Sequence, residues 1–296
     1  MHEIARLNYI QWDPEFTDKK PFEVHMDLPQ EYPPKNFRVD EESYQIIEDI
    51  RGREGQFSLD DHGFCVKSHP LSLTNFDRET VEKQYFPQVE EILKAQLGSH
   101  VRVHIFDWRL RSSDNRKTEK KAGTAVDLND PLTYLKPVSG VHVGNESIDA
   151  IINCNISNIR KDQSEGGARQ RVSHHMNGEA KTLLKGRFRI INSVPPDKLL
   201  TVDHVRRDYV GESLYPLFSE DYKWYYFSRQ TKDEVLLLKI YDSCLNAKAR
   251  RELNGATKLG RVLMSVVCPH TSFKQSQPLG NNNPRETIEV RALVFS

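Results

Sequence analysis

The chain has 296 residues, enough to bury a substantial hydrophobic core in one large domain or two small ones. Its 42 lysine and arginine residues balance 42 aspartate and glutamate residues, so no excess charge favours a nucleic-acid or anionic-membrane partner. With 37% hydrophobic residues and a mean hydropathy of −0.65, the composition is polar yet globular, and the apolar runs are far too short to span a bilayer.

The cysteines and the N-terminus favour a cytoplasmic location. Glu3 and Arg6 interrupt the first residues, which therefore do not resemble a signal peptide. The four cysteines form no Cys-x-x-Cys pair, which favours reduced thiols over disulfides or a zinc finger; they are Cys65, Cys154, Cys244 and Cys268.

The first half of the chain predicts an arm, short strands and one long helix. Residues 1–40 are rich in proline and aromatic residues and predict an irregular arm that wraps the core. Phe57–Phe64 is typical of a strand, a turn and a second strand. From Asp77, a residue type suited to an N-cap, apolar residues recur at three- and four-residue spacing until Gly98, which predicts a helix over 77–97.

The remaining elements are mostly strands. Alternation predicts a strand over 101–110, the charged run 115–121 predicts a solvated loop, and 179–184 predicts a short helix. Further strands are predicted over 186–192, 222–227, 234–242 and 284–295, the last with Ile288, Val290, Ala292 and Val294 directed inward. This pattern favours one mainly β domain over 1–296, a β-sandwich or barrel with supporting helices.

A more specific signal is a series of short blocks along nearly the whole chain. They are Asp49–Gly52, Ser58–Phe64, Gly140–Val143, Asp162–Ala168, Leu184–Asn192, Tyr209–Glu212, Lys223–Phe227, Asp233–Ser243, Pro269–Phe273 and Pro284–Arg291. In this order they resemble a fungal family of non-haem iron, 2-oxoglutarate-dependent oxygenases, often labelled by similarity to the cephalosporin methoxylation protein CmcJ. The resemblance implies a double-stranded β-helix (jelly-roll) fold and hydroxylation or desaturation of a small secondary metabolite.

The resemblance also implies an iron held by a His-x-Asp pair and a distal histidine, with 2-oxoglutarate bound to Fe(II) and to an arginine. His142 matches the first histidine and His270 the distal one. Arg285, assisted by Thr287, matches the cosubstrate anchor, with Arg291 in reserve. Two imidazoles and a carboxylate cover one face of an octahedral Fe(II) and leave positions for the keto acid and dioxygen. The alternative for Arg291 is a structural ion pair with a nearby acid.

The carboxylate ligand departs from the family's pattern. On a strand His142 and residue 144 share a face, but Gly144 supplies no oxygen. Either glycine truly replaces the acid, as in iron-dependent halogenases, or an insertion has displaced it. The family's continuation after His-Val stands intact from Asp162, so removing 144–161 would restore the motif and makes Asp162 the candidate carboxylate ligand. The alternative is that Asp162 is an ordinary turn aspartate.

Two further departures accompany this one. The family's Trp-Arg-Pro-Leu stretch is missing after Asn192, and extra residues separate Arg251 from Val267. Retained introns near 144–161 and 252–266, with a skipped segment near 193, are one hypothesis; a continuous reading frame through all three junctions in the transcript would refute it.

Three functions stay open. The first is an Fe(II)/2-oxoglutarate-dependent oxidoreductase acting on a small molecule. The second is a metal-free or catalytically impaired member that serves as a binding protein, a cyclase or isomerase, or one subunit of a homo- or heterodimer. The third is a halogenase that keeps Gly144 at the metal. None of them involves a nucleic acid or a membrane.

Overall fold

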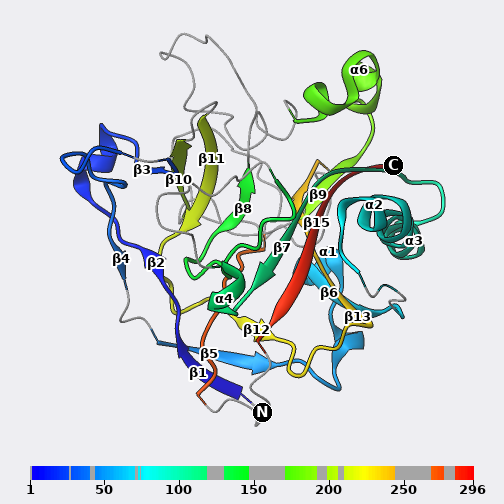
Figure 1. Ribbon diagram of the computed structural model, residues 1–296, viewed down its shortest axis with the longest axis horizontal. Coiled ribbons are helices and arrows are strands. Elements are labelled where there is room, and N and C mark those ends of the chain that lie inside the picture. The colour runs from blue at the N-terminus through cyan, green and yellow to red at the C-terminus, as the bar shows by residue number, and fades with distance from the viewer. Residues whose placement is uncertain are drawn as a thin grey trace, which may run out of the picture.

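The computed structural model of the chain describes every residue except 1, 27, 41–43, 71–72, 74, 119–129, 147–170, 192–198, 206–209, 244–267 and 277–283. The described residues form mostly strands (Figure 1): β1 (His2–Arg6), β2 (Tyr9–Ile10), β3 (Phe22–Val24), β4 (Val39–Asp40), β5 (Tyr44–Asp49), β6 (Phe64–Ser68), β7 (Arg102–Ser112), β8 (Val143–Glu146), β9 (Phe188–Ile191), β10 (Leu199–Val205), β11 (Val210–Pro216), β12 (Trp224–Tyr226), β13 (Glu234–Leu238), β14 (Ile240–Asp242) and β15 (Glu286–Phe295).

The helical elements are fewer and mostly short. They are η1 (Pro14–Thr17), η2 (Glu54–Gln56), α1 (Leu59–His62), α2 (Arg78–Thr80), η3 (Val81–Tyr85), α3 (Phe86–Leu97), α4 (Asn115–Thr118), η5 (Asn177–Glu179) and α6 (Ala180–Leu183). No helix among the described residues is long and apolar enough to cross a membrane.

Two four-stranded sheets form the centre of the described structure. One has the strand order β3-β10-β11-β8 and the other β14-β9-β15-β7. Figure 1 shows them next to each other, with α2 and α3 beyond β15 on the side away from β8. Smaller sheets complete the fold, with the orders β1-β5-β12, β13-β6 and β2-β4. The mainly β architecture predicted from the sequence is confirmed.

The predicted long helix is present and begins and ends at the predicted residues. Asp77 accepts a hydrogen bond from the Thr80 amide at 2.8 Å, which caps the first turn. The helix then runs through α2, a π-helical turn at η3, and α3, and it stops at Gly98, whose φ is 108°. Leu93 on α3 packs with Val101 and Val294, so the helix covers one face of the β7–β15 pair.

The β7–β15 pair has two chemically different faces. Trp108 and Leu110 on β7 pack with Ile288 and Val290 on β15 in a core beneath α3. The alternate positions point to the opposite face, where Thr287 lies across from Arg111, Glu289 across from Arg109 and Arg291 across from Asp107. The prediction that Ile288 and Val290 are directed inward is confirmed, and the core that they reach lies on the helix side of the sheet.

Two local predictions were wrong. Phe57–Phe64 begins with the helix α1 rather than a strand, because Ser58 caps it by accepting the Asp61 amide at 3.1 Å and Gly63 ends it with φ 79°. The charged run at 115–121 opens with the helical turn α4 instead of a loop, and Asp114 accepts the Arg116 amide at 3.0 Å there.

The N-terminal arm is more regular than predicted. β1 pairs antiparallel with β5, and β3 pairs parallel with β10. Ala5, Leu7 and Tyr9 are buried against Trp224, whose indole N–H donates to the Tyr9 hydroxyl at 2.9 Å. The arm therefore forms part of the core, since its strands complete sheets built from the rest of the chain.

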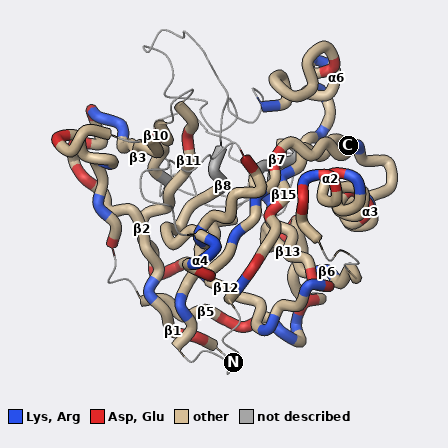
Figure 2. The backbone as a smooth tube through the Cα atoms, viewed as in Figure 1, with Lys and Arg blue, Asp and Glu red and all other residues tan. Residues whose placement is uncertain are grey.

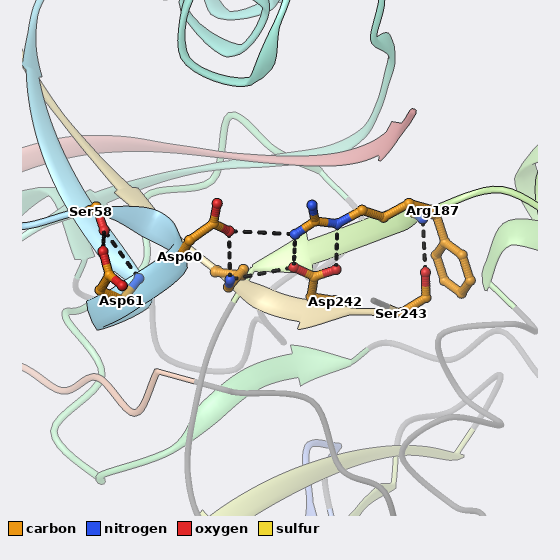
Figure 3. A network of polar contacts seen from close by, with 8 residues as sticks. Ser58, Asp60, Asp61, Arg187, Asp242 and Ser243 are labelled. Atoms are coloured by element: carbon orange, nitrogen blue, oxygen red, sulfur yellow. Dashed lines mark hydrogen bonds and ion pairs between the residues drawn. The ribbon is translucent and has the colours of Figure 1, made fainter. Parts of the chain in front are cut away.

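A partly buried network of charges joins α1 to the residues at β9 and β14 (Figure 3). The Arg187 guanidinium holds the Asp242 carboxylate with two hydrogen bonds of 3.0 and 2.7 Å. Lys239, which is fully buried, lies 3.4 Å from both Asp242 and Asp60. A buried lysine without such partners would be strongly destabilising, so these carboxylates are what allow Lys239 to lie in the core.

Candidate metal and cosubstrate site

Two histidines distant in sequence meet at the start of β8, the edge strand of the β3-β10-β11-β8 sheet. His142, directly before β8, and His270 form an isolated antiparallel bridge with reciprocal N–H to O distances of 3.2 and 3.0 Å. Their ring centroids are 4.4 Å apart. Backbone hydrogen bonds thus hold both imidazoles at one place without any contribution from a ligand.

Each imidazole uses Nδ1 in the same way. His142 Nδ1 lies 2.9 Å from the Gly140 carbonyl oxygen, and His270 Nδ1 lies 3.3 Å from that of Cys268. A carbonyl oxygen can only accept, so Nδ1 carries the proton and the lone pair remains on Nε2. Metal-binding histidines typically have this arrangement, because the second nitrogen fixes the tautomer and the ring orientation.

Both imidazoles are held neutral. Burial, followed by the neighbouring His270, holds the pKa of His142 well below its usual value. Burial likewise lowers the pKa of His270. Burial raises the pKa of the adjacent Cys268 thiol to about 12, so this cysteine does not offer a thiolate at neutral pH. The site therefore offers neutral nitrogen ligands, which suit a transition metal.

The polar face of the β7–β15 pair lies next to these histidines. Arg111 Nε donates to Glu289 at 2.6 Å, and Arg291 pairs with Asp107 and lies 3.9 Å from Glu289. Besides the effect of burial, Glu289 raises the pKa of His270, whereas Arg291 and Arg111 lower it, so the charges of this face act on the imidazole. Figure 2 shows the positive and negative residues interspersed along β7 and β15. Arg291 thus makes the ion pairs expected of its alternative role.

Arg285 differs from its neighbours on this face. Its backbone is fixed by two hydrogen bonds, from its own amide to Ser113 Oγ at 2.8 Å and from the Ser113 amide to its carbonyl at 2.9 Å. Within the described residues its guanidinium forms no ion pair. Surrounding protein lowers the pKa of Arg285, yet the residue remains exposed, and Glu289 keeps 39% of its side-chain surface accessible. Both charged groups therefore remain accessible to a ligand from solvent.

The charges on this face favour an acidic ligand. Among the described residues of this face, four arginines accompany two carboxylates; they are Arg109, Arg111, Arg285 and Arg291, with Asp107 and Glu289. Arg111 and Arg291 keep the pKa of Glu289 below its usual value although burial acts in the other direction. The surplus of guanidinium groups suits a dicarboxylate, which they can bind in bidentate fashion. Arg111 and Glu289 were not among the sequence candidates; alternating charge in the apolar 101–112 strand was the available signal.

The third metal ligand is not among the described residues near the pair. Asp162, the predicted carboxylate ligand, lies outside the described residues. Gly144 does not begin a loop: residues 144–146 continue β8, and a register shift between Ser213 and Leu214 makes Gly144 the extra residue of a β-bulge. The first residues of the predicted insertion at 144–161 thus belong to β8, and residues 147–161 lie outside the described residues, so the insertion stays a prediction.

The chain is similar to several known proteins. The profile of a family described as an oxidoreductase/YMDC permease-like domain matches residues 7–193 and 192–295. The hydroxylase/desaturase efuI of Hormonema carpetanum is 30% identical over 282 residues, which cover 84% of this chain and 82% of that protein. The alpha-ketoglutarate-dependent dioxygenase phiK of a fungal species (strain ATCC 74256) is 28% identical over 292 residues, 90% of this chain and 88% of that protein.

A solved structure has the same fold. The iron and alpha-ketoglutarate-dependent endoperoxidase NvfI superposes with a TM-score of 0.72 at 22% sequence identity. The superposition covers 99% of this chain and 98% of the NvfI chain. The curated nvfI sequence from Aspergillus novofumigatus is 26% identical over 276 residues, 83% of this chain and 81% of that protein.

Proposed function

We infer the function from the premise that this chain belongs to the oxidoreductase family of the fungal hydroxylases/desaturases and 2-oxoglutarate-dependent dioxygenases. The chain is an enzyme of this family, an Fe(II)/2-oxoglutarate-dependent oxidoreductase of fungal-type secondary metabolism. The assignment of the active site rests on one observation: His142 and His270 form a backbone bridge beside an arginine-rich face of the sheet.

The two histidines fit an Fe(II) ion, and we assign them as two of its ligands. Both are neutral, and both keep Nε2 available because Nδ1 donates to a backbone carbonyl. Asp162 remains the proposed third ligand. When bound with 2-oxoglutarate, Fe(II) activates dioxygen for oxidation of an unactivated carbon–hydrogen bond. The protein's own contribution is to hold the ligands in place before the metal arrives.

Arg285 is the proposed anchor of the 2-oxoglutarate carboxylate. Arg291 and Arg111 already neutralise Asp107 and Glu289, whereas Arg285 has no ion-pair partner within the described residues. Thr287 follows on the same face of β15 and can donate its hydroxyl to the same carboxylate. Arg291 would then set the local potential and hold Asp107, with no direct contact to the cosubstrate.

The finer features of the assignment rest on the family. A double-stranded β-helix in a single domain is the fold we propose, supported by the two four-stranded sheets and the superposition with NvfI. The proposed partner is a small secondary metabolite that is hydroxylated or desaturated, as the relatives' names indicate. Among the described residues, Cys65 and Cys268 form no disulfide, which is consistent with the proposed cytoplasmic location.

One observation favours a second candidate. Gly144 is integrated into β8, so the position two residues after His142 carries no oxygen ligand. A metal-free or impaired member, or a halogenase with a halide beside Gly144, would have this arrangement. The alternatives differ in iron binding and in their requirement for halide.

The deciding experiment is an anaerobic titration of the full chain with Fe(II) and 2-oxoglutarate. The expected result is the weak visible charge-transfer band of a chelated keto acid, lost in His270→Ala and Arg285→Ala. Loss in Asp162→Ala but not in the matched Glu146→Ala would assign the third ligand. A folded protein that gives no band would overturn the oxygenase assignment and favour the metal-free alternative; turnover only with added halide would identify a halogenase.

A further inference from the structure

A second group of metal-binding side chains lies where the N-terminal arm joins the β3-β10-β11-β8 sheet. In the parallel β3–β10 ladder His204 lies across from Glu23, and the His25 amide donates to the Val205 carbonyl at 2.8 Å. Side chains alternate along a strand, so Glu23 and His25 point to the same side as His204. One ligand atom from each of the three residues lies within 4.8 Å of the other two.

The two imidazoles of this group share one hydrogen bond. His25 Nε2 lies 2.6 Å from His204 Nδ1, and the rings are parallel with centroids 4.9 Å apart. His204 Nε2 lies 3.4 Å from the Tyr215 hydroxyl. If Nε2 of His204 carries the proton and donates it to Tyr215, the lone pair of Nδ1 faces His25. Metal-binding histidines are typically oriented in this way, by a hydrogen bond from the nitrogen that does not bind the metal.

The carboxylate completes a set suited to a divalent transition metal. Glu23 Oε2 lies 3.7 Å from His25 Nε2. His204 is buried, whereas Glu23 and His25 retain about a third of their side-chain surface, at 32% and 29%. One nitrogen is therefore anchored in the core, and the other two ligands lie at the surface through which an ion can enter.

We propose that Glu23, His25 and His204 form a second divalent metal site of the zinc class, which fastens the N-terminal arm to β10. Binding requires the proton to leave the space between the two imidazoles, and His25 stays neutral in this step because its proton moves through solvent from Nε2 to Nδ1. Metal–nitrogen distances of about 2.0–2.1 Å at tetrahedral angles require the two nitrogens to lie roughly 3.3 Å apart. The rings must therefore separate by less than an ångström, and the solvent-accessible His25 side chain can provide this movement.

The site is separate from the His142–His270 pair and does not depend on the proposed oxygenase function. Tyr215 lies between the two, with ring centroids 5.9 Å from His204 and 6.4 Å from His142. The β3–β10 ladder contains only three residue pairs. A metal cross-link at its end would hold the arm where backbone hydrogen bonds are few.

The test is a zinc titration of the full-length His270→Ala protein, with a chromophoric chelator as competitor, so that the first site is disabled. One equivalent of zinc should bind to this protein. Adding His204→Ala should weaken binding at least about 100-fold, because changes around a ligand alone cost about 10–100-fold. Glu23→Gln, which keeps the side-chain shape, should weaken it about 10–100-fold and abolish the zinc-induced rise in Tm.

His174→Ala is the matched control, because His174 belongs to a different described histidine group; it contacts His175, whose ring centroid lies 5.5 Å from that of His104. Equal zinc affinity in Glu23→Gln and its parent, or loss of the equivalent in His174→Ala instead, would overturn the proposal. If His204→Ala does not fold, Glu23→Gln alone decides. Failure of the oxygenase assignment would appear separately, as a missing keto-acid band in otherwise wild-type protein.

Discussion

The two faces of the β7–β15 pair belong to the same strands, but one face packs in the core and the other presents charged residues. The helix-side face buries Trp108, Leu110, Ile288 and Val290 beneath α3. The other face presents arginines and carboxylates beside His142 and His270. Strand alternation separates packing from ligand chemistry with a spacing of one residue. Substitutions on one face should therefore change the free energy of unfolding, and those on the other should change ligand affinity.

The largest effect is expected on the helix side. Trp108 is 5% exposed, and Trp108→Ala would leave a large cavity beneath α3. We expect a loss of about 3–5 kcal/mol in the free energy of unfolding. Urea denaturation measures it. A loss below about 1 kcal/mol would mean that this face contributes little to the core.

His270→Ala should produce the opposite pattern. Removing one of two described nitrogen ligands should weaken Fe(II) binding by more than about 100-fold, with a small change in Tm because the residue is only partly buried. Metal titration and a thermal scan on the same sample check this. Unchanged iron affinity would remove His270 from the site.

Arg285→Ala should affect the cosubstrate alone. A hydrogen-bonded carboxylate–guanidinium contact is worth about 1.5–3 kcal/mol, so the KM for 2-oxoglutarate should rise about 10–100-fold. Steady-state assays at varied 2-oxoglutarate give the value. Arg116→Ala, which removes an exposed arginine paired with Asp114, is the control and should leave KM unchanged.

The metal-free protein should lose stability in acid through His142. Its folded pKa lies below the unfolded value, so the unfolded state binds more protons in that interval. The stability present above about pH 6.5 should fall as the pH decreases towards the folded pKa, by about 1.4 kcal/mol for each unit of pKa difference. Urea midpoints at several pH values should show less dependence in His142→Gln than in the exposed control His100→Gln.

The smallest effect concerns the helix that covers the apolar face. Asp77→Ala removes the 2.8 Å cap on the Thr80 amide and should cost about 1 kcal/mol of stability. The affinity for 2-oxoglutarate should not change, since the cap lies on the far side of the sheet. A changed KM would show that the two faces are coupled through α3.

Local signals accounted for the elements that the sequence predicted well. Asp77 and Gly98 delimit the helix by capping chemistry, and alternation places the strand that became β15. The same rules could have revealed α1, since Ser58 and Gly63 are capping residues, but alternation of apolar residues suggested a strand. Elements that depend on residues close together in the sequence can be predicted, provided that competing patterns are compared.

The site was less accessible to local reasoning. The proximity of His142 and His270 was implied only by the family resemblance, because the bridge joins distant segments. The apolar residues of β15 were correctly predicted to point into the core, but nothing local showed that this core lies beneath α3 and that the charged side faces the site. The sequence of one strand shows that it has an apolar and a charged face. What each face packs against depends on contacts with residues distant in sequence.

The backbone bridge between His142 and His270 also has a consequence for chain entropy. It closes a loop of roughly 130 residues, and bringing the ends of such a loop together costs about 4 kcal/mol in an unfolded chain. An ion shared by the two imidazoles would act as a removable cross-link across that loop. The unfolding rate should therefore depend on the concentration of free metal ion. A chelator should shorten the lifetime of the folded chain even though the contacts between protein residues are unchanged.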